Sequence, residues 1–145
     1  MGHEAFDTMT SRYALERQVG FLLRKAHQRH TSIFTNGVRG QIRPSQFAVI
    51  AKLAEMGPVS QNELGRLTAM DSATIKGVVD RLIKRGFLKD VAPEDSRYRF
   101  TDLTTEGRQF YETTIPVARR ITAETLEPLT PDERRTLLRL LKKLS

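Results

Sequence analysis

The sequence contains no cysteine. This absence excludes disulfide bonds, thiolate metal sites and redox sensing through a thiol. No apolar run is long enough to span a membrane, and no charged-then-apolar signal segment opens the chain. A chain of 145 residues can bury a core without such crosslinks. We therefore expect a cytoplasmic protein with one compact fold and no membrane partner.

Basic residues outnumber acidic ones, with 24 Lys and Arg against 17 Asp and Glu, which gives a net charge of +7. This excess is typical of a protein that binds a polyanion, most simply nucleic acid, although a soluble protein with a positive surface fits it about as well. The excess is concentrated in residues 12–43 and 76–89. Only the second segment falls where a helix could read DNA.

The hydrophobic pattern predicts a mainly α-helical chain with a small β-hairpin. Apolar residues at three- and four-residue steps predict helices over residues 11–35 and 44–55. Ser60-x-x-Glu63 is a capping box that opens a short helix ending near residue 67. Asp71 suits the N-cap of a helix over residues 72–85. Two strands, over residues 87–91 and 98–103, are expected to form the hairpin.

Two more helices are predicted after the hairpin. Thr104 can cap the first, which would run to about residue 126, with Pro116 expected to kink or divide it. Thr130-Pro131-Asp132-Glu133 is a capping box for the last helix, which would run to residue 144. The leucines of this last helix exceed what a small domain can cover. We expect the first and last helices to form a homodimer interface rather than pack within one monomer.

A short capped helix, a tight link, a longer helix and a hairpin follow one another in the order of a winged helix-turn-helix. Such a helix fits the major groove, and the hairpin reaches the adjacent minor groove. Early residues of the longer helix suit base edges, whereas later arginines and Lys84 suit phosphates. Each residue alone could be ordinary surface, but the combination favours DNA. The candidate DNA-binding residues are Ser60, Gln61, Ser72, Thr74, Lys76, Arg81, Arg85, Arg97 and Arg99.

Several motifs between residues 60 and 107 resemble those of the MarR family of regulators. They are Asp71, Val79-Asp80-Arg81-Leu82, Arg85-Gly86-Phe87-Leu88, Pro93-Glu94-Asp95-Ser96-Arg97 and Leu103-Thr104-x-x-Gly107. The resemblance covers nearly the whole chain. It implies an N-terminal arm and dimerisation helix (1–42), a winged DNA-binding domain (43–103) and C-terminal dimerisation helices (104–145). It also implies repression through double-stranded DNA, at a pseudo-palindromic operator.

Two positions depart from the usual family pattern. The hairpin tip of the family usually carries Asp-Arg-Arg, whereas this chain has Asp95-Ser96-Arg97. The resemblance implies that Asp95 orients an arginine of the wing and that Arg97 enters the minor groove. Arg43 stands where the family often has threonine, so the helix that begins at Pro44 is expected to lack a side-chain cap.

The stretch from Gln18 to His30 resembles the branch of the family that represses nicotinate degradation. This resemblance implies release from DNA by a small aromatic carboxylate such as 6-hydroxynicotinate. Histidines near an arginine can hold a carboxylate against an apolar floor. Alternatively, the histidines could be hydrogen-bonded interface residues, metal ligands or pH-sensitive groups. The candidate ligand-binding residues are Arg17, Gln18, Arg24, His27 and His30.

Other functions find less support in the sequence. It has no glycine-rich phosphate loop and no nucleophile elbow, so we expect neither an enzyme nor a cofactor. A winged-helix protein that binds only other proteins remains an alternative, because a fold does not fix a function. Another alternative is a DNA-binding regulator without a small-molecule effector.

Overall fold

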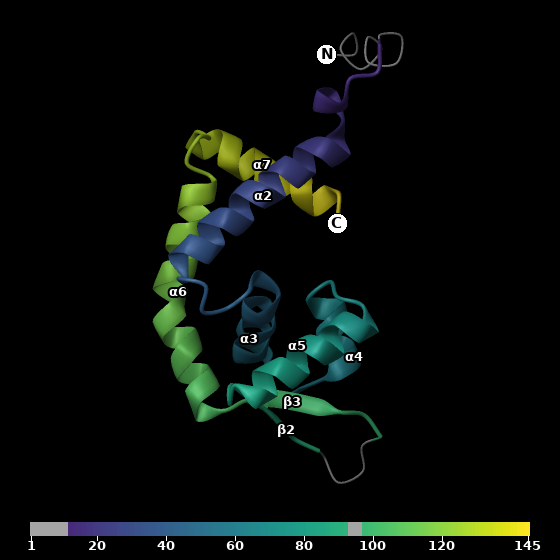
Figure 1. Ribbon diagram of the computed structural model, residues 1–145, viewed down its shortest axis with the longest axis vertical. Helices are drawn as coiled ribbons and strands as arrows, with labels where there is room; N and C mark the ends of the chain where they lie inside the picture. Colours follow the sequence, from purple (N-terminus) through teal and green to yellow (C-terminus); the bar gives the residue numbers. More distant parts are fainter. Residues whose placement is uncertain (1–11, 93–96) are drawn as a thin grey trace.

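The computed structural model describes residues 12–92 and 97–145 (Figure 1). Its elements run in the order η1 (Leu15–Arg17), α2 (Val19–Gly37), α3 (Pro44–Met56), β1 (Val59–Ser60), α4 (Gln61–Leu67), α5 (Ser72–Lys84), β2 (Leu88–Asp90), β3 (Phe100–Leu103), α6 (Thr105–Thr125) and α7 (Pro131–Lys143). Helices α3, α4 and α5 lie with the small sheet at one end, and α2 and α7 lie at the other (Figure 1). Helix α6 runs between the two ends. The prediction of a mainly α-helical winged fold is confirmed.

The hydrophobic core lies where α3, α4, α5 and the sheet meet. Their apolar side chains at helical spacing turn to one side, and several of them are completely buried. Burying one such side chain contributes about 1.5–3 kcal/mol. The core therefore holds α5 in a fixed position against α3, α4 and the sheet. The fully buried aliphatic side chains are Val49, Ile50, Leu53, Leu64, Ile75, Val79, Leu82 and Leu88.

The sheet has three antiparallel strands in the order β1-β3-β2, one more than the predicted hairpin. Leu88 pairs with Leu103 in the hairpin, and Val59 of β1 pairs with Thr101 on the other edge of β3. Strand β1 has only two residues. It is therefore too short to produce the alternating pattern from which strands are recognised in a sequence.

The first predicted helix, over residues 11–35, is wrong at its N-terminal end. Gln18 has an extended backbone (φ −84°, ψ 136°) and separates η1 from α2. Its side-chain amide donates a hydrogen bond to the carbonyl oxygen of Ala14 at 3.0 Å. Apolar residues continue at helical spacing across this break, from Leu15 to Val19, so the pattern could not reveal it.

Helix α3 begins at Pro44 as predicted and has no side-chain cap on Arg43. Arginine has only donors, so it cannot accept from the free N–H groups of the first turn. The reverse bond is present instead, because Gln46 Oε1 accepts from the Arg43 N–H at 3.1 Å.

Helix α6 is a single element from Thr105 to Thr125, and Pro116 does not divide it. Proline removes the hydrogen bond to the carbonyl of Glu112. Both Pro116 and Glu112 are exposed, so water can satisfy that carbonyl. At its N-terminal end α6 packs against the wing, residues 87–103: Gly107 lies so close to the carbonyl oxygen of Phe87 that no Cβ would fit between them.

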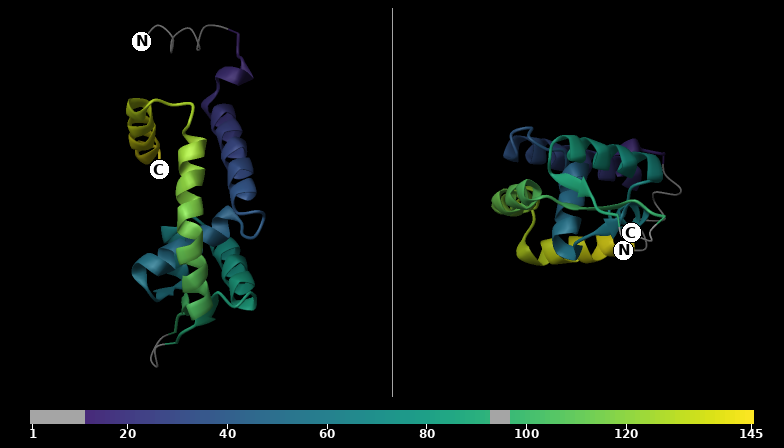
Figure 2. Two further views of the ribbon diagram at one scale, coloured as in Figure 1. Left: turned by 90° about the vertical axis from the view of Figure 1, so that its left-hand side faces the viewer. Right: turned by 90° about the horizontal axis from the view of Figure 1, so that it is seen from below.

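Helix α2 crosses α6 at close range, and α7 lies on the opposite side of α6 from α2. A Cβ on Gly37 would lie 2.8 Å from Ile121 Cγ1, which locates the crossing. Figures 1 and 2 together show α7 away from α2, with α6 between them. The predicted capping box of α7 is confirmed, because Thr130 and Glu133 exchange both hydrogen bonds. No residue of α7 is buried.

Candidate nucleic-acid interface and adjoining cavity

The turn between α4 and α5 brings the two helices into close contact. A Cβ on Gly65 would lie 3.0 Å from the Met70 carbonyl oxygen and 3.2 Å from Ile75 Cγ2. Ala69 adopts a left-handed conformation with φ 57°, which reverses the chain. The Met70 N–H donates to the Gly65 carbonyl oxygen at 2.8 Å. The predicted tight link is thus a compact turn that fixes α5 against α4.

The first turn of α5 is exposed and capped. Asp71 Oδ1 accepts a hydrogen bond from the Thr74 N–H at 2.7 Å. This bond holds the pKa of Asp71 below its usual value, because it favours the charged carboxylate. Ser72 and Thr74 are exposed at the start of the helix. The Ser72 hydroxyl can therefore donate to or accept from an external partner, whereas the Thr74 hydroxyl already bonds the Asp71 carboxylate and can still accept.

Farther along α5, cations line the exposed side. Lys76 Nζ lies 3.0 Å from Asp80 Oδ2, one turn later. Arg81 and Lys84 are exposed. The guanidinium of Arg85 lies 4.8 Å from the centre of the Phe87 ring, a cation–π distance. The predicted phosphate-binding residues therefore follow one another along the C-terminal half of α5.

Arg99 holds the wing against α4 and α5. Its Nη1 donates to Gln61 Oε1 at 3.0 Å and to Asp80 Oδ1 at 2.8 Å, and its Nε donates to Asp90 Oδ1 at 2.8 Å. Hydrogen bonds from Lys76 and Arg99 keep the pKa of Asp80 below its usual value. The bonds to Asp90 and Asp80 raise the pKa of Arg99. The Arg99 side chain is therefore bonded to three elements of the protein itself, α4, α5 and β2.

The nine candidate DNA-binding residues divide into two groups. Ser72, Thr74, Lys76, Arg81, Arg85 and Arg97 are exposed. Ser60, Gln61 and Arg99 are half-buried and already bonded: Ser60 Oγ caps α4 by accepting from the Glu63 N–H at 3.2 Å. The expected role of Asp95 at the hairpin tip lies outside the described residues.

Asp80 is a residue of this interface that the sequence analysis did not single out. It joins Lys76 on its own helix to Arg99 on the wing. Its place in the run Val79-Asp80-Arg81-Leu82 was the available indication. Its spacing of four residues from Lys76 also fits an ion pair on one helix face.

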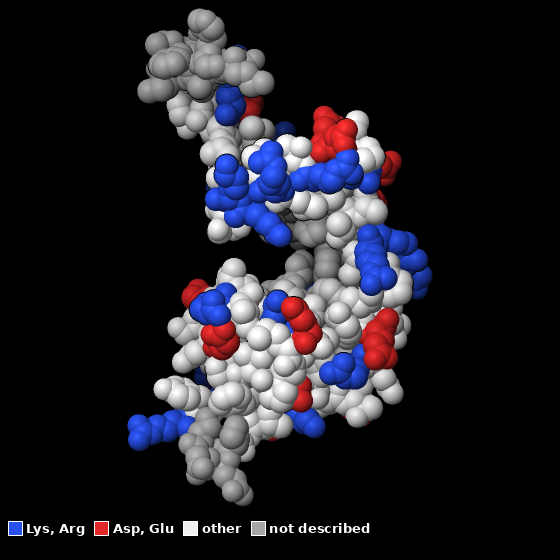
Figure 3. Space-filling view, turned by 180° about the vertical axis from the view of Figure 1, so that it is seen from behind, with Lys and Arg blue, Asp and Glu red and all other residues white. Residues whose placement is uncertain are grey.

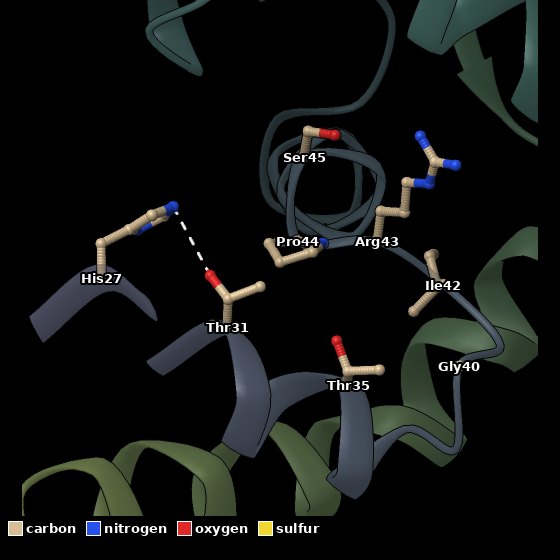
Figure 4. Close-up of a pocket in the computed structure, with 8 residues that line it drawn as sticks. All are labelled: His27, Thr31, Thr35, Gly40, Ile42, Arg43, Pro44 and Ser45. Carbon is tan, nitrogen blue, oxygen red and sulfur yellow. Dashed lines mark hydrogen bonds between the residues drawn. The ribbon is translucent and has the colours of Figure 1, made fainter. Parts of the chain in front are cut away.

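A cavity of about 580 Å³ lies between α2 and the start of α3 (Figure 4). Figure 4 shows His27 at one side of the cavity and Arg43 at the other, with Thr31 and Thr35 between them. His27 Nε2 lies 3.5 Å from Thr31 Oγ1. Within residues 12–92 and 97–145, no acidic residue lines it. The cavity therefore offers a cation, an imidazole and hydroxyl groups to an anionic guest.

Only His27 of the five candidate ligand-binding residues lines this cavity. His30 instead faces α6, where its Nδ1 lies 2.9 Å from Thr125 Oγ1. Burial and the nearby His27 lower the pKa of His30. Arg17 and Gln18 precede α2, and Arg24 lies one turn before His27 on that helix. Sequence reasoning missed Thr31 and missed Arg43 as a lining residue.

The two histidines do not converge with a third ligand in the part of the chain that the structure covers. Residues 12–92 and 97–145 contain no group of three or more His, Asp or Glu side chains that could hold a metal ion. Within the same residues, no helix has the length and hydropathy needed to cross a membrane.

Comparison with known proteins identifies the family. The model of the MarR family matches residues 42–97. The HTH-type transcriptional repressor NicR of Pseudomonas putida is 40% identical over 134 residues, which cover 91% of this chain and 85% of NicR.

Two solved structures resemble the whole fold. Bordetella bronchiseptica BpsR, whose DNA binding is regulated by 6-hydroxynicotinic acid, has a TM-score of 0.87 and 37% identity, covering 92% of this chain and 97% of BpsR. A MarR variant from Escherichia coli in complex with operator DNA has a TM-score of 0.82 and 26% identity, covering 92% and 99%. With its winged lobe and its similarity to a transcriptional repressor over most of its length, this chain belongs to the MarR family and is a transcriptional regulator, not an enzyme.

Proposed function

We propose that the protein is a repressor that binds a pseudo-palindromic operator as a homodimer and is released by a small aromatic carboxylate such as 6-hydroxynicotinate. The observation that carries this proposal is the exposed polar face of α5, held beside a wing that carries the exposed Arg97.

The DNA-binding part of the proposal rests on the direction of the exposed side chains. Ser72, Thr74 and Lys76 lie on the first turns of α5, where a recognition helix meets base edges. Arg81 and Lys84 are placed farther along the helix for phosphates, and Arg97 for the minor groove. Arg99 takes a positioning role, because its guanidinium is held by Asp80 and Asp90.

The dimer part rests on α7, whose leucines lack cover. Leu140, Leu141 and Leu144 share one side of the helix and are 44%, 38% and 72% exposed. Lys and Arg side chains occupy another side of α7, and they gather there when the molecule is seen from behind (Figure 3). They are Arg134, Arg135, Arg139, Lys142 and Lys143. A second copy of the chain would cover the leucine side in a two-fold interface.

The effector part rests on the cavity between α2 and α3. BpsR, which this chain resembles over 92% of its length, is regulated by an aromatic carboxylate. His27 and Arg43 can hold a carboxylate, and the side chains of Thr31 and Ile42 add hydroxyl and apolar contacts. The cavity joins α2, in the proposed dimer interface, to α3 of the winged lobe. Filling it can therefore change the spacing of the two recognition helices, which must match the DNA helical repeat.

The test is binding to the duplex upstream of the protein's own gene, at fixed salt, with and without 6-hydroxynicotinate. We expect tight binding that the acid weakens. Arg97→Ala should weaken operator binding about tenfold or more, since a groove contact contributes roughly 1–3 kcal/mol, whereas Lys142→Ala on α7 should not. His27→Ala should preserve DNA binding and abolish release by the acid.

Each alternative function has its own outcome in this experiment. Tight binding that no acid weakens would favour a regulator without this effector. A failure to select any DNA sequence would favour a winged-helix protein that binds other proteins. Unchanged affinity of Arg97→Ala would remove the wing from the DNA interface, and persistent release in His27→Ala would move the effector out of the cavity.

A further inference from the structure

A second cavity, of about 290 Å³, lies on the other side of the link between α2 and α3, against α6. Arg39 and Gln41 of the link line this cavity, whereas Gly40 and Ile42 line the first one. Alternating residues of one short segment therefore border the two cavities. We refer to the second cavity, with Arg39 on the link and Arg120 on α6, as the link cavity.

The link cavity is lined by cations and neutral donors. Arg39 and Arg120 both line it, and none of the described residues that line it is acidic. Among the residues that the structure describes, neither guanidinium has a carboxylate partner. The hydroxyl groups of Thr113 and Thr114 and the amide of Gln41 add neutral hydrogen-bonding groups. Two arginines that line one cavity without an acidic partner match the oxygen atoms of a carboxylate or phosphate.

The backbone of Arg39 supports a role for its side chain. Arg39 has φ 55°, in the left-handed region, and Gly40 follows with φ 68°. An arginine there costs about 1 kcal/mol or more, whereas glycine or asparagine adopts this conformation more readily. Residues held in such conformations are concentrated at ligand sites. Gly37 packs against Ile121 just before the link, so the link is anchored at the edge of the cavity.

We propose that the link cavity is a second ligand site, which binds a small oxyanion, a carboxylate or a phosphate, between Arg39 and Arg120. The site is separate from the cavity that we assign to the aromatic effector. Because one link borders both cavities, an anion bound in the link cavity changes the affinity of the first cavity for the effector. This coupling rests on the proposed function, whereas the anion site itself does not.

The test is calorimetric titration of the full-length protein with inorganic phosphate and with benzoate, at constant ionic strength. The titration is done with the His27→Ala variant, so that the histidine of the first cavity does not contribute to the measured anion binding. Arg39→Asn keeps a residue that tolerates the left-handed conformation, and Arg120→Gln keeps a good helix former. Arg119→Gln is the matched control, since Arg119 is the exposed neighbour on α6 and does not line the cavity.

We expect at least one probe to bind, and Arg39→Asn and Arg120→Gln each to weaken it by about tenfold or more, because each removes a charged hydrogen-bond donor. Arg119→Gln should leave the affinity unchanged. Binding of phosphate alone identifies a phosphate site, and binding of benzoate alone identifies a carboxylate site. No binding of either probe, unchanged affinity in both cavity variants, or an equal loss in Arg119→Gln would overturn the proposal. A failure of the proposed function would appear separately, as DNA that 6-hydroxynicotinate does not release.

Discussion

At the scale of single residues, Thr101 has a buried side chain that lowers the stability of the fold. It is completely buried in β3, and its hydroxyl has no hydrogen-bond partner in the described residues. An unpaired buried hydroxyl destabilises the folded state by about 1–3 kcal/mol. We expect Thr101→Val, which keeps the shape and removes the hydroxyl, to raise the free energy of unfolding by about 1 kcal/mol in urea denaturation. Thr101→Ser, which keeps the hydroxyl and loses a methyl group, should lower it, and a Thr101→Val protein less stable than the native one would contradict this reading.

His30 should make stability depend on pH. Its pKa is lowered by burial and by the neighbouring His27, so the folded state favours the neutral ring. The unfolded chain, with the ordinary value of 6.5, binds the proton more readily. The contribution of neutral His30 to the free energy of unfolding is therefore fully present above pH 6.5. It is lost as the pH falls from there through the folded-state pKa of His30.

The measurement is the free energy of unfolding at several pH values between about 5 and 8. The native protein should lose stability on the acid side, and His30→Gln should flatten this part of the curve. The carboxylates with lowered pKa values, such as Asp71 and Asp80, titrate at lower pH and so fall outside this window. An unchanged slope in His30→Gln would show that another group causes the dependence.

Residues whose role depends on near neighbours could be predicted from the sequence. Ser60, Asp71, Thr104 and Thr130 were each identified as helix caps, and all four accept the expected backbone hydrogen bond. Arg99 could not be assigned in this way, because its partner Gln61 is 38 residues away and Asp80 is 19 residues away. Only the packing of the wing on α4 and α5 brings these groups together.

At the scale of elements, the junction between α5 and α6 is held by Thr104. Its Oγ1 accepts from the Gly107 N–H at 3.0 Å and donates to the Gly86 carbonyl oxygen at 2.6 Å. We expect Thr104→Ala to lower the free energy of unfolding by about 1–2 kcal/mol, because both bonds are lost. Thr104→Ser keeps the hydroxyl and should recover most of this loss in thermal or urea unfolding. Equal losses in both variants would mean that the methyl group, not the hydroxyl, matters here.

Element types could be predicted well, and element ends less well. Periodicity, caps and proline positions indicated all six α-helices, α2 to α7, and the hairpin. They did not indicate β1, which exists only because Val59 and Ser60 meet β3, or the extended Gln18 before α2. The cavity lining was also beyond the sequence, because α2 and the start of α3 meet there only through the fold.

At the scale of the whole molecule, the leucine side of α7 predicts the oligomeric state. Leu141→Glu places a charge on that side, and two-fold symmetry makes each substitution count twice. Since burial of one leucine contributes about 1.5–3 kcal/mol, we expect the dimer to dissociate at concentrations where the native protein does not. Lys142→Glu, next to it on the basic side, is the control, and sedimentation equilibrium is the measurement. Identical behaviour of both variants would place the interface elsewhere.

The close contact of Gly107 with Phe87 has a mechanical consequence for the regulator. Helix α6 is 21 residues long, or about 30 Å at a rise of 1.5 Å per residue. Because the N-terminal end of α6 is fixed to the wing, the helix acts as a lever arm. A tilt of about 5° about its C-terminal end would move the wing by roughly 3 Å, close to the 3.4 Å rise of one base pair along a DNA strand. A small change in the angle of α6 is thus enough to take the wing out of register with the groove.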